Sequence, residues 1–160
     1  MTMQTVTQQL IALIPVIVGA FVALAGGGIK YWIDQTNSKK ARRREKLERL
    51  LHLAYNVSAW SSSLDGRHAF GTGDEELPSP LGELRVIGAI YFPELSNEIK
   101  VLVFTALKYS GVVHQLGAER LGAGAIPDNA NDKIREAYEP LSEAIHKLAE
   151  KAAELAKDLA

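Results

Sequence analysis

Hydrophobic positions follow two different patterns along the chain. From Leu10 to Ile29, twenty consecutive residues carry no charge. At the rise of an α-helix this run is about 30 Å long, which is about the thickness of the hydrocarbon core of a bilayer. The run predicts a transmembrane helix over residues 10–33, preceded by a short extracytoplasmic tail of residues 1–9.

After this run, apolar residues recur at spacings of three and four, which is typical of amphipathic helices. We expect a helix from Gln35 to about Leu64, with an apolar face made of Leu47, Leu50, Leu51, Ala54, Val57 and Leu64. Residues 65–80 show no periodicity and contain several glycines and prolines, so we expect a loop there, with disorder as the default.

Three further helices are predicted. Ser79 and Pro80 are typical of a helix start, and a short helix is expected to end at about Tyr91. A corner at Pro93 leads into a helix ending at about Leu121, whose apolar side is Leu95, Ile99, Leu102, Ala106, Tyr109, Val113 and Leu116.

The last helix, from about Asn131, has the most regular heptad pattern. Its a positions are Tyr138, Ile145, Ala152 and Leu159, and its d positions are Ile134, Leu141, Leu148 and Leu155. Pro140 falls at c, off the seam, while Ser142, Ala149 and Ala156 at e widen the apolar face. Such a helix packs within one bundle or pairs between two subunits, and the pattern leaves both arrangements open.

The predicted fold is therefore all-α, with one N-terminal transmembrane helix followed by a bundle of about three long helices and one short helix. Residues 34–50 form a basic juxtamembrane start of the first bundle helix, and residues 51–160 form the bundle itself. One modest core fits this length.

Charge sets the predicted orientation. Residues 30–50 hold eight Lys or Arg against three Asp or Glu, whereas residues 1–29 hold no charged side chain. Lys and Arg that flank a span are retained in the cytoplasm. We therefore expect a bacterial inner-membrane protein with its N-terminus outside and its C-terminal bundle in the cytoplasm.

Cleavage of the uncharged run as a signal peptide after Ala25 is an alternative, although the tail lacks the usual basic residues. A buried core helix of a soluble protein is a second alternative to a transmembrane helix, but such a helix does not need so long an uncharged run.

The basic segment also predicts contact with an anionic inner leaflet. Lys30 can reach the headgroups, and Tyr31 and Trp32 suit the membrane interface. The remaining candidate headgroup contacts are Lys39, Lys40, Arg42, Arg43, Arg44 and Lys46. A plain topology signal, without specific lipid recognition, explains the same residues.

Small residues recur every four positions in the predicted span. Gly19, Ala23 and Gly27 share one helix face, and this spacing lets two helix backbones approach closely. The face predicts a homo-oligomer, although glycine and alanine are common in membrane helices in any case.

No catalytic or metal-binding motif occurs in the sequence. The chain has no cysteine, and its four histidines lack the spacings of helix-borne metal sites. The serines occur in no nucleophile motif. The net charge of −1 does not favour nucleic acid. We therefore expect no catalysis, no cofactor and no metal, and no nucleic acid partner.

The anchor, the Arg-rich start of a helix and the apolar corner Tyr91-Phe92-Pro93-Glu94-Leu95 together resemble small uncharacterised bacterial single-pass membrane proteins with a helical cytoplasmic domain. The resemblance is one of layout and implies no activity. The expected function is a membrane-anchored interaction or scaffold subunit that self-associates and binds a protein partner through its bundle. The alternative is a membrane-perturbing effector, of toxin or host-defence type, that oligomerises through the glycine-rich span.

Overall fold

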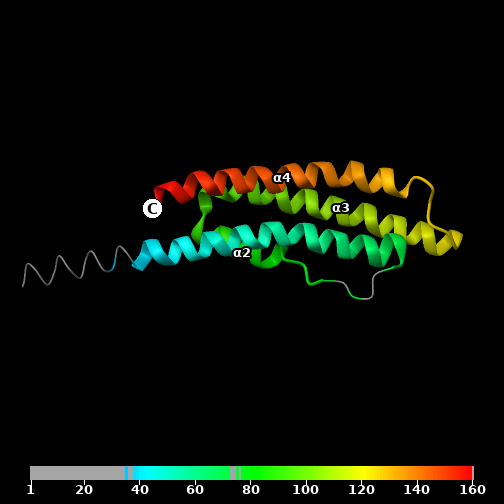
Figure 1. Cartoon of the computed structure of the whole chain (residues 1–160), viewed down its shortest axis with the longest axis horizontal. Coiled ribbons are helices and arrows are strands. Elements are labelled where there is room, and N and C mark those ends of the chain that lie inside the picture. Colours follow the sequence, from blue (N-terminus) through cyan, green and yellow to red (C-terminus); the bar gives the residue numbers. More distant parts are fainter. Residues whose placement is uncertain (1–34, 36–37, 73–74, 76, 160) are drawn as a thin grey trace, which may run out of the picture. The chain divides into compact units, whose positions relative to one another are not determined.

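The computed structural model describes residues 35, 38–72, 75 and 77–159 (Figure 1). The regular elements in these ranges are all helical and include no strand, which confirms the all-α prediction for this part of the chain. The chain divides into two compact units, residues 1–42 and residues 43–160. Of the first unit, residues 35 and 38–42 are described, and they are helical and exposed.

The predicted span over residues 10–33 lies outside the described ranges. Within those ranges, none of the helices combines the length and the apolar composition that crossing a bilayer requires.

Residues 43–64 are helical and form what we call the leading helix of the second unit. Its predicted apolar face is confirmed, because Leu47, Leu50, Ala54, Val57 and Leu64 are buried and Leu51 is half-buried. Ser61 lies in the same row with its side chain fully buried, and its hydroxyl donates to the carbonyl of Val57 at 2.8 Å. This bond satisfies a polar group that burial otherwise destabilises.

The leading helix continues into a π-helical turn, η1 (Asp65–Phe70), where the sequence pattern predicted an irregular loop. Ala69 of this turn is fully buried. Gly71 ends the turn with φ +67°, a left-handed conformation that glycine adopts without strain. The opposing helix approaches closely at Gly117, where an added Cβ would lie 3.0 Å from the carbonyl oxygen of His68. Tertiary packing thus orders residues for which local periodicity gave no signal.

The short predicted helix is present as α2 (Leu81–Tyr91), with Leu84 and Ile87 buried. The predicted corner follows, with Phe92 fully buried and Pro93 beginning a 3-10 turn, η2 (Pro93–Leu95). This turn leads directly into α3 (Ser96–Ala123). Every residue of the predicted apolar side of α3 is buried.

The last helix, α4 (Ala130–Asp158), runs without interruption through the exposed Pro140. Its seam residues Leu141, Ile145, Leu148 and Ala152 are buried, and Ile134, Tyr138 and Leu155 are half-buried. Helices α3 and α4 lie side by side (Figure 1) and share one hydrophobic core with the leading helix and α2. The heptad seam of α4 therefore packs into the core of its own chain.

Candidate functional site

Six of the predicted site residues lie outside the described ranges. These are the three residues of the helix-association face and three of the headgroup contacts: Gly19, Ala23, Gly27, Lys30, Tyr31 and Trp32. Of the other predicted headgroup contacts, Lys39, Lys40 and Arg42 belong to the first unit and are exposed.

Arg43 differs from its basic neighbours because it makes contacts inside the bundle. Its Nε donates to the carbonyl of Tyr91 at 3.3 Å, and its guanidinium pairs with Glu94. The guanidinium carbon also lies 5.5 Å from the ring centroid of Phe92, within range of a cation–π interaction. Arg43 thus joins the start of the leading helix to the corner between α2 and α3.

A second basic residue of the leading helix binds α2 in a bidentate pair. Nε and one terminal nitrogen of Arg49 donate to the two carboxylate oxygens of Glu83, each at 2.9 Å. This hydrogen bond lowers the pKa of Glu83, and the charges of Arg49, Lys46 and His52 act in the same direction. The same pair raises the pKa of Arg49. By contrast, Arg44 is exposed and lies 4.0 Å from Glu48 of its own helix.

Two tyrosines and two other polar side chains, from the leading helix, η1, α3 and α4, form a connected group. The hydroxyl of Tyr109 contacts both carboxylate oxygens of Asp65, at 2.6 and 2.5 Å. The hydroxyl of Tyr138 donates to Oγ of Ser58 at 3.2 Å. The two tyrosine rings meet edge to face at 5.8 Å. We call these four residues (Ser58, Asp65, Tyr109 and Tyr138) the polar cluster.

Burial shifts the pKa of two members of the polar cluster, Asp65 and Tyr109. It raises the pKa of Asp65, and the hydrogen bond from Tyr109 opposes this effect. The pKa of Tyr109 is also raised, first by burial and then by its hydrogen bond to Asp65. Tyr109 is therefore a neutral hydrogen-bond donor at physiological pH, and it holds a half-buried carboxylate in place.

The structure brings together two histidines that the sequence placed in separate elements. The rings of His68 in η1 and His114 in α3 lie 4.4 Å apart, edge to face. In the described part of the chain, no group of three or more His, Cys, Asp or Glu side chains has the geometry to hold a metal ion. The histidine pair is a contact between η1 and α3.

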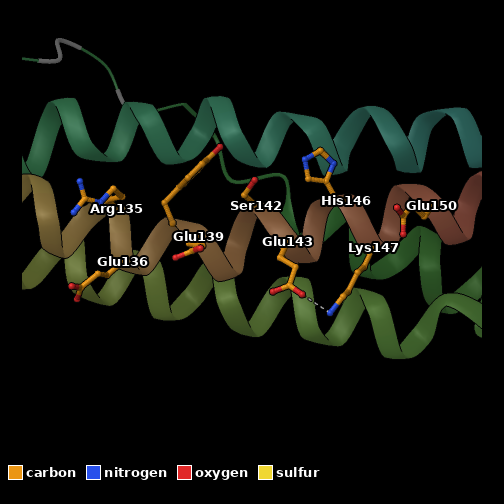
Figure 2. Close-up of a pocket in the computed structure, with 9 residues that line it drawn as sticks. Arg135, Glu136, Glu139, Ser142, Glu143, His146, Lys147 and Glu150 are labelled. Carbon is orange, nitrogen blue, oxygen red and sulfur yellow. Dashed lines mark ion pairs between the residues drawn. The ribbon is translucent and has the colours of Figure 1, made fainter.

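A hollow of about 800 Å³ lies along the outer face of α4 and is lined by nine residues of that helix alone (Figure 2). Ser142 and His146 point towards the leading helix, whereas Glu143 and Lys147 point towards α3 and form an ion pair at 2.7 Å. That pair lowers the pKa of Glu143 and raises the pKa of Lys147. With one helix as its whole lining, the hollow is an open, solvated surface rather than a cleft that encloses a substrate.

No family model matches the chain, and comparison with curated proteins and with solved structures finds no match.

Proposed function

We propose that this chain is a membrane-anchored helical scaffold subunit. The observation that carries the proposal is the uncharged run from Leu10 to Ile29, which is followed at once by the basic segment and then by a compact helical unit that begins at Arg43. A span of this length anchors the chain, and the bundle presents a surface for a protein partner. In this proposal the helical bundle is the part of the subunit that lies outside the bilayer.

In this proposal the anchor lies in a bacterial inner membrane, with the N-terminus outside and the bundle in the cytoplasm. The excess of Lys and Arg on the C-terminal side of the run supports this orientation. A phosphatase reporter fused after the last residue tests it, because alkaline phosphatase is active only outside the cytoplasm. We expect an inactive fusion, and an active one contradicts the orientation.

The scaffold self-associates through the face made of Gly19, Ala23 and Gly27. Because the chain contains no cysteine, single-cysteine variants give an unambiguous cross-linking test. We expect Ala23→Cys to form a disulfide-linked dimer in oxidised membranes. Phe21→Cys is the matched control, since two residues rotate a helix position by about 200°. Equal cross-linking at both positions contradicts a specific face.

A membrane-perturbing effector is the second candidate, because an oligomerising glycine-rich span also suits that role. The run from Leu10 to Ile29 has no charged residue to line an aqueous pore, and this favours the scaffold. Overexpression with a membrane-potential dye separates the two functions. The scaffold leaves the potential unchanged. Rapid depolarisation that Gly19→Leu or Ala23→Leu abolishes establishes the effector instead.

A further inference from the structure

Helix α3 exposes three apolar side chains on the face that points away from the core. Phe104 is 60% exposed, Leu107 is 59% exposed and Val101 is 43% exposed. Successive spacings of three residues place them on one side of the helix. We call these three residues (Val101, Phe104 and Leu107) the α3 row. A contiguous apolar row marks an interaction site more often than single exposed residues do.

The α3 row borders a groove between α3 and α4. The two helices run antiparallel, because Glu119 near the end of α3 binds Lys133 near the start of α4, whereas Tyr109 meets Tyr138. Residues from the first half of α3 therefore lie level with residues from the second half of α4.

Two hollows, of about 380 and 370 Å³, lie along this groove. Phe104 of α3 and Pro140 of α4 help to line the first hollow, and Val101 and Ala144 help to line the second. Each hollow has room for an apolar side chain of a partner. The groove thus combines an exposed aromatic ring with spaces that fit such a ring.

The first hollow also carries one charge of each sign. Lys108 lines it from α3 and Glu136 lines it from α4. Figure 2 shows the Glu136 side chain on the α3 side of α4. The ammonium group of Lys108 lies 5.0 Å from the centroid of the Phe104 ring. Within the described part of the chain, neither Lys108 nor Glu136 forms an ion pair.

This surface is complementary to a second copy of itself. A two-fold axis along the groove keeps each residue at its level and exchanges the two sides, so that α3 of one copy faces α4 of the other. Lys108 of each copy then faces Glu136 of the other, and Phe104 faces the hollow beside Pro140. Self-complementarity in shape and charge is what a two-fold interface requires. An unrelated partner does not require the chain to carry both halves of the contact.

We propose that a second copy of the chain docks in the groove between α3 and α4, about a two-fold axis along the groove. Phe104 of each copy enters the hollow beside Pro140 of the other copy, and Lys108 pairs with Glu136 of the other copy. The contact from Glu98 to Val112 is about 21 Å long. This is short for a permanent dimer, so association rises with the concentration of the chain.

Cross-linking of single-cysteine variants of the full chain tests the proposal, because the chain contains no cysteine. Val101→Cys places a thiol beside the proposed axis. Val86→Cys is the matched control, since Val86 is also an exposed valine but lies on α2. With a short bismaleimide cross-linker, we expect Val101→Cys to give several-fold more dimer than Val86→Cys. Equal yields of dimer overturn the proposal.

Exchange of the two charges tests the pairing itself. Added to Val101→Cys, either Lys108→Glu or Glu136→Lys places like charges opposite each other and should lower the yield of dimer to the control level. A chain with both changes should recover the yield, because each new carboxylate then faces a new ammonium group. Lys100→Glu is the matched control, since Lys100 is exposed on α3 outside the lining of both hollows.

Two outcomes of the charge exchange overturn the proposal. One is a yield that stays low when both changes are combined, and the other is an equal loss in Lys100→Glu. Recovery by the combined changes also shows that neither change prevents folding.

The groove contact does not depend on the predicted span, and Ala23→Cys separates the two. Dimer at position 101 without dimer at position 23 supports the groove and contradicts the face in the span. Dimer at position 23 without dimer at position 101 retains the face in the span and overturns the groove contact. Protection of position 101 from maleimide in membranes without a cross-linked dimer shows that another protein covers the groove, and this also overturns the proposal.

Discussion

Two regions of the bundle bind carboxylates through side-chain contacts, but one region is exposed to water and the other is half-buried. Where α2 meets the leading helix, Arg43 and Arg49 bind Glu94 and Glu83, and these groups stay in contact with water. Where η1 meets α3, the half-buried Asp65 is bound by the neutral hydroxyl of Tyr109. Exposed ion pairs contribute little because water and salt screen them, whereas a buried group that loses its partner is costly. The loss of its partner is therefore expected to cost more stability at Asp65 than at Glu83 or Glu94.

The largest effect is expected for Tyr109→Phe. The ring remains and fills the same space, but the Asp65 carboxylate loses its donor in a half-buried site. We expect the free energy of unfolding to fall by about 1–3 kcal/mol, the usual cost of a buried group left without its partner. Urea unfolding followed by circular dichroism measures it. Tyr138→Phe is the control, since it removes a single 3.2 Å bond to a neutral hydroxyl. An equal loss in both variants contradicts a special role for the carboxylate.

Arg43→Gln is expected to have the next largest effect. The variant loses the hydrogen bond to the Tyr91 carbonyl and the contact with the Phe92 ring. We expect a destabilisation of about 1 kcal/mol, typical of one hydrogen bond. Faster amide exchange at the corner of residues 91–95 should accompany it. Arg44→Gln controls for the loss of charge, because within the described residues the ion pair of Arg44 is the 4.0 Å contact with Glu48 of its own helix. Unchanged exchange at the corner rejects the role assigned to Arg43.

Asp65→Asn tests whether burial of the ionised Asp65 carboxylate destabilises the fold. The folded-state pKa of Asp65 is raised, so the folded chain holds this proton more tightly than the unfolded chain does. The resulting stabilisation is complete below about pH 3.8 and is lost as pH rises through the folded-state pKa. Asparagine is neutral at every pH. We expect the variant to be more stable than the parent at neutral pH, with a difference that shrinks towards pH 3.8. A variant that is less stable at neutral pH shows that the hydrogen bond outweighs desolvation.

Glu83→Gln is expected to have the smallest effect on stability. At neutral pH its sign is opposite to that expected for Asp65→Asn. The pKa of Glu83 is lowered, so its ionised form stabilises the fold above about pH 4.5, and this contribution is lost as pH falls through the folded-state pKa. The variant should be slightly less stable than the parent at neutral pH, and the gap should close in acid and in high salt. Unfolding curves at two salt concentrations measure this. A gap that does not respond to salt is inconsistent with an exposed ion pair.

The apolar faces of the bundle helices could be predicted because burial repeats with the period of the helix. Leu141, Ile145, Leu148 and Ala152 in α4 illustrate this, and so does the buried side of α3. The heptad register also predicts that Pro140 lies off the seam, and Pro140 is exposed in α4.

The polar contacts could not be predicted in the same way. Arg43 was grouped with the other basic residues because nothing in the local sequence distinguishes it from Arg42 or Arg44. Its partners Tyr91 and Glu94 lie 48 and 51 residues further along the chain. The π-helical turn η1 was also missed, because its order depends on close packing against Gly117 rather than on any periodicity of its own.

The sequence by itself determined the α-helices of the bundle, their buried faces and the corner at Pro93, because these follow from interactions among residues a few positions apart. Only the tertiary structure decided that the heptad seam of α4 packs within one chain, that Arg43 binds the corner, and that Asp65 meets Tyr109. Each of these depends on which helices become neighbours. That choice is made by the packing of whole faces, so it cannot be read from any single segment.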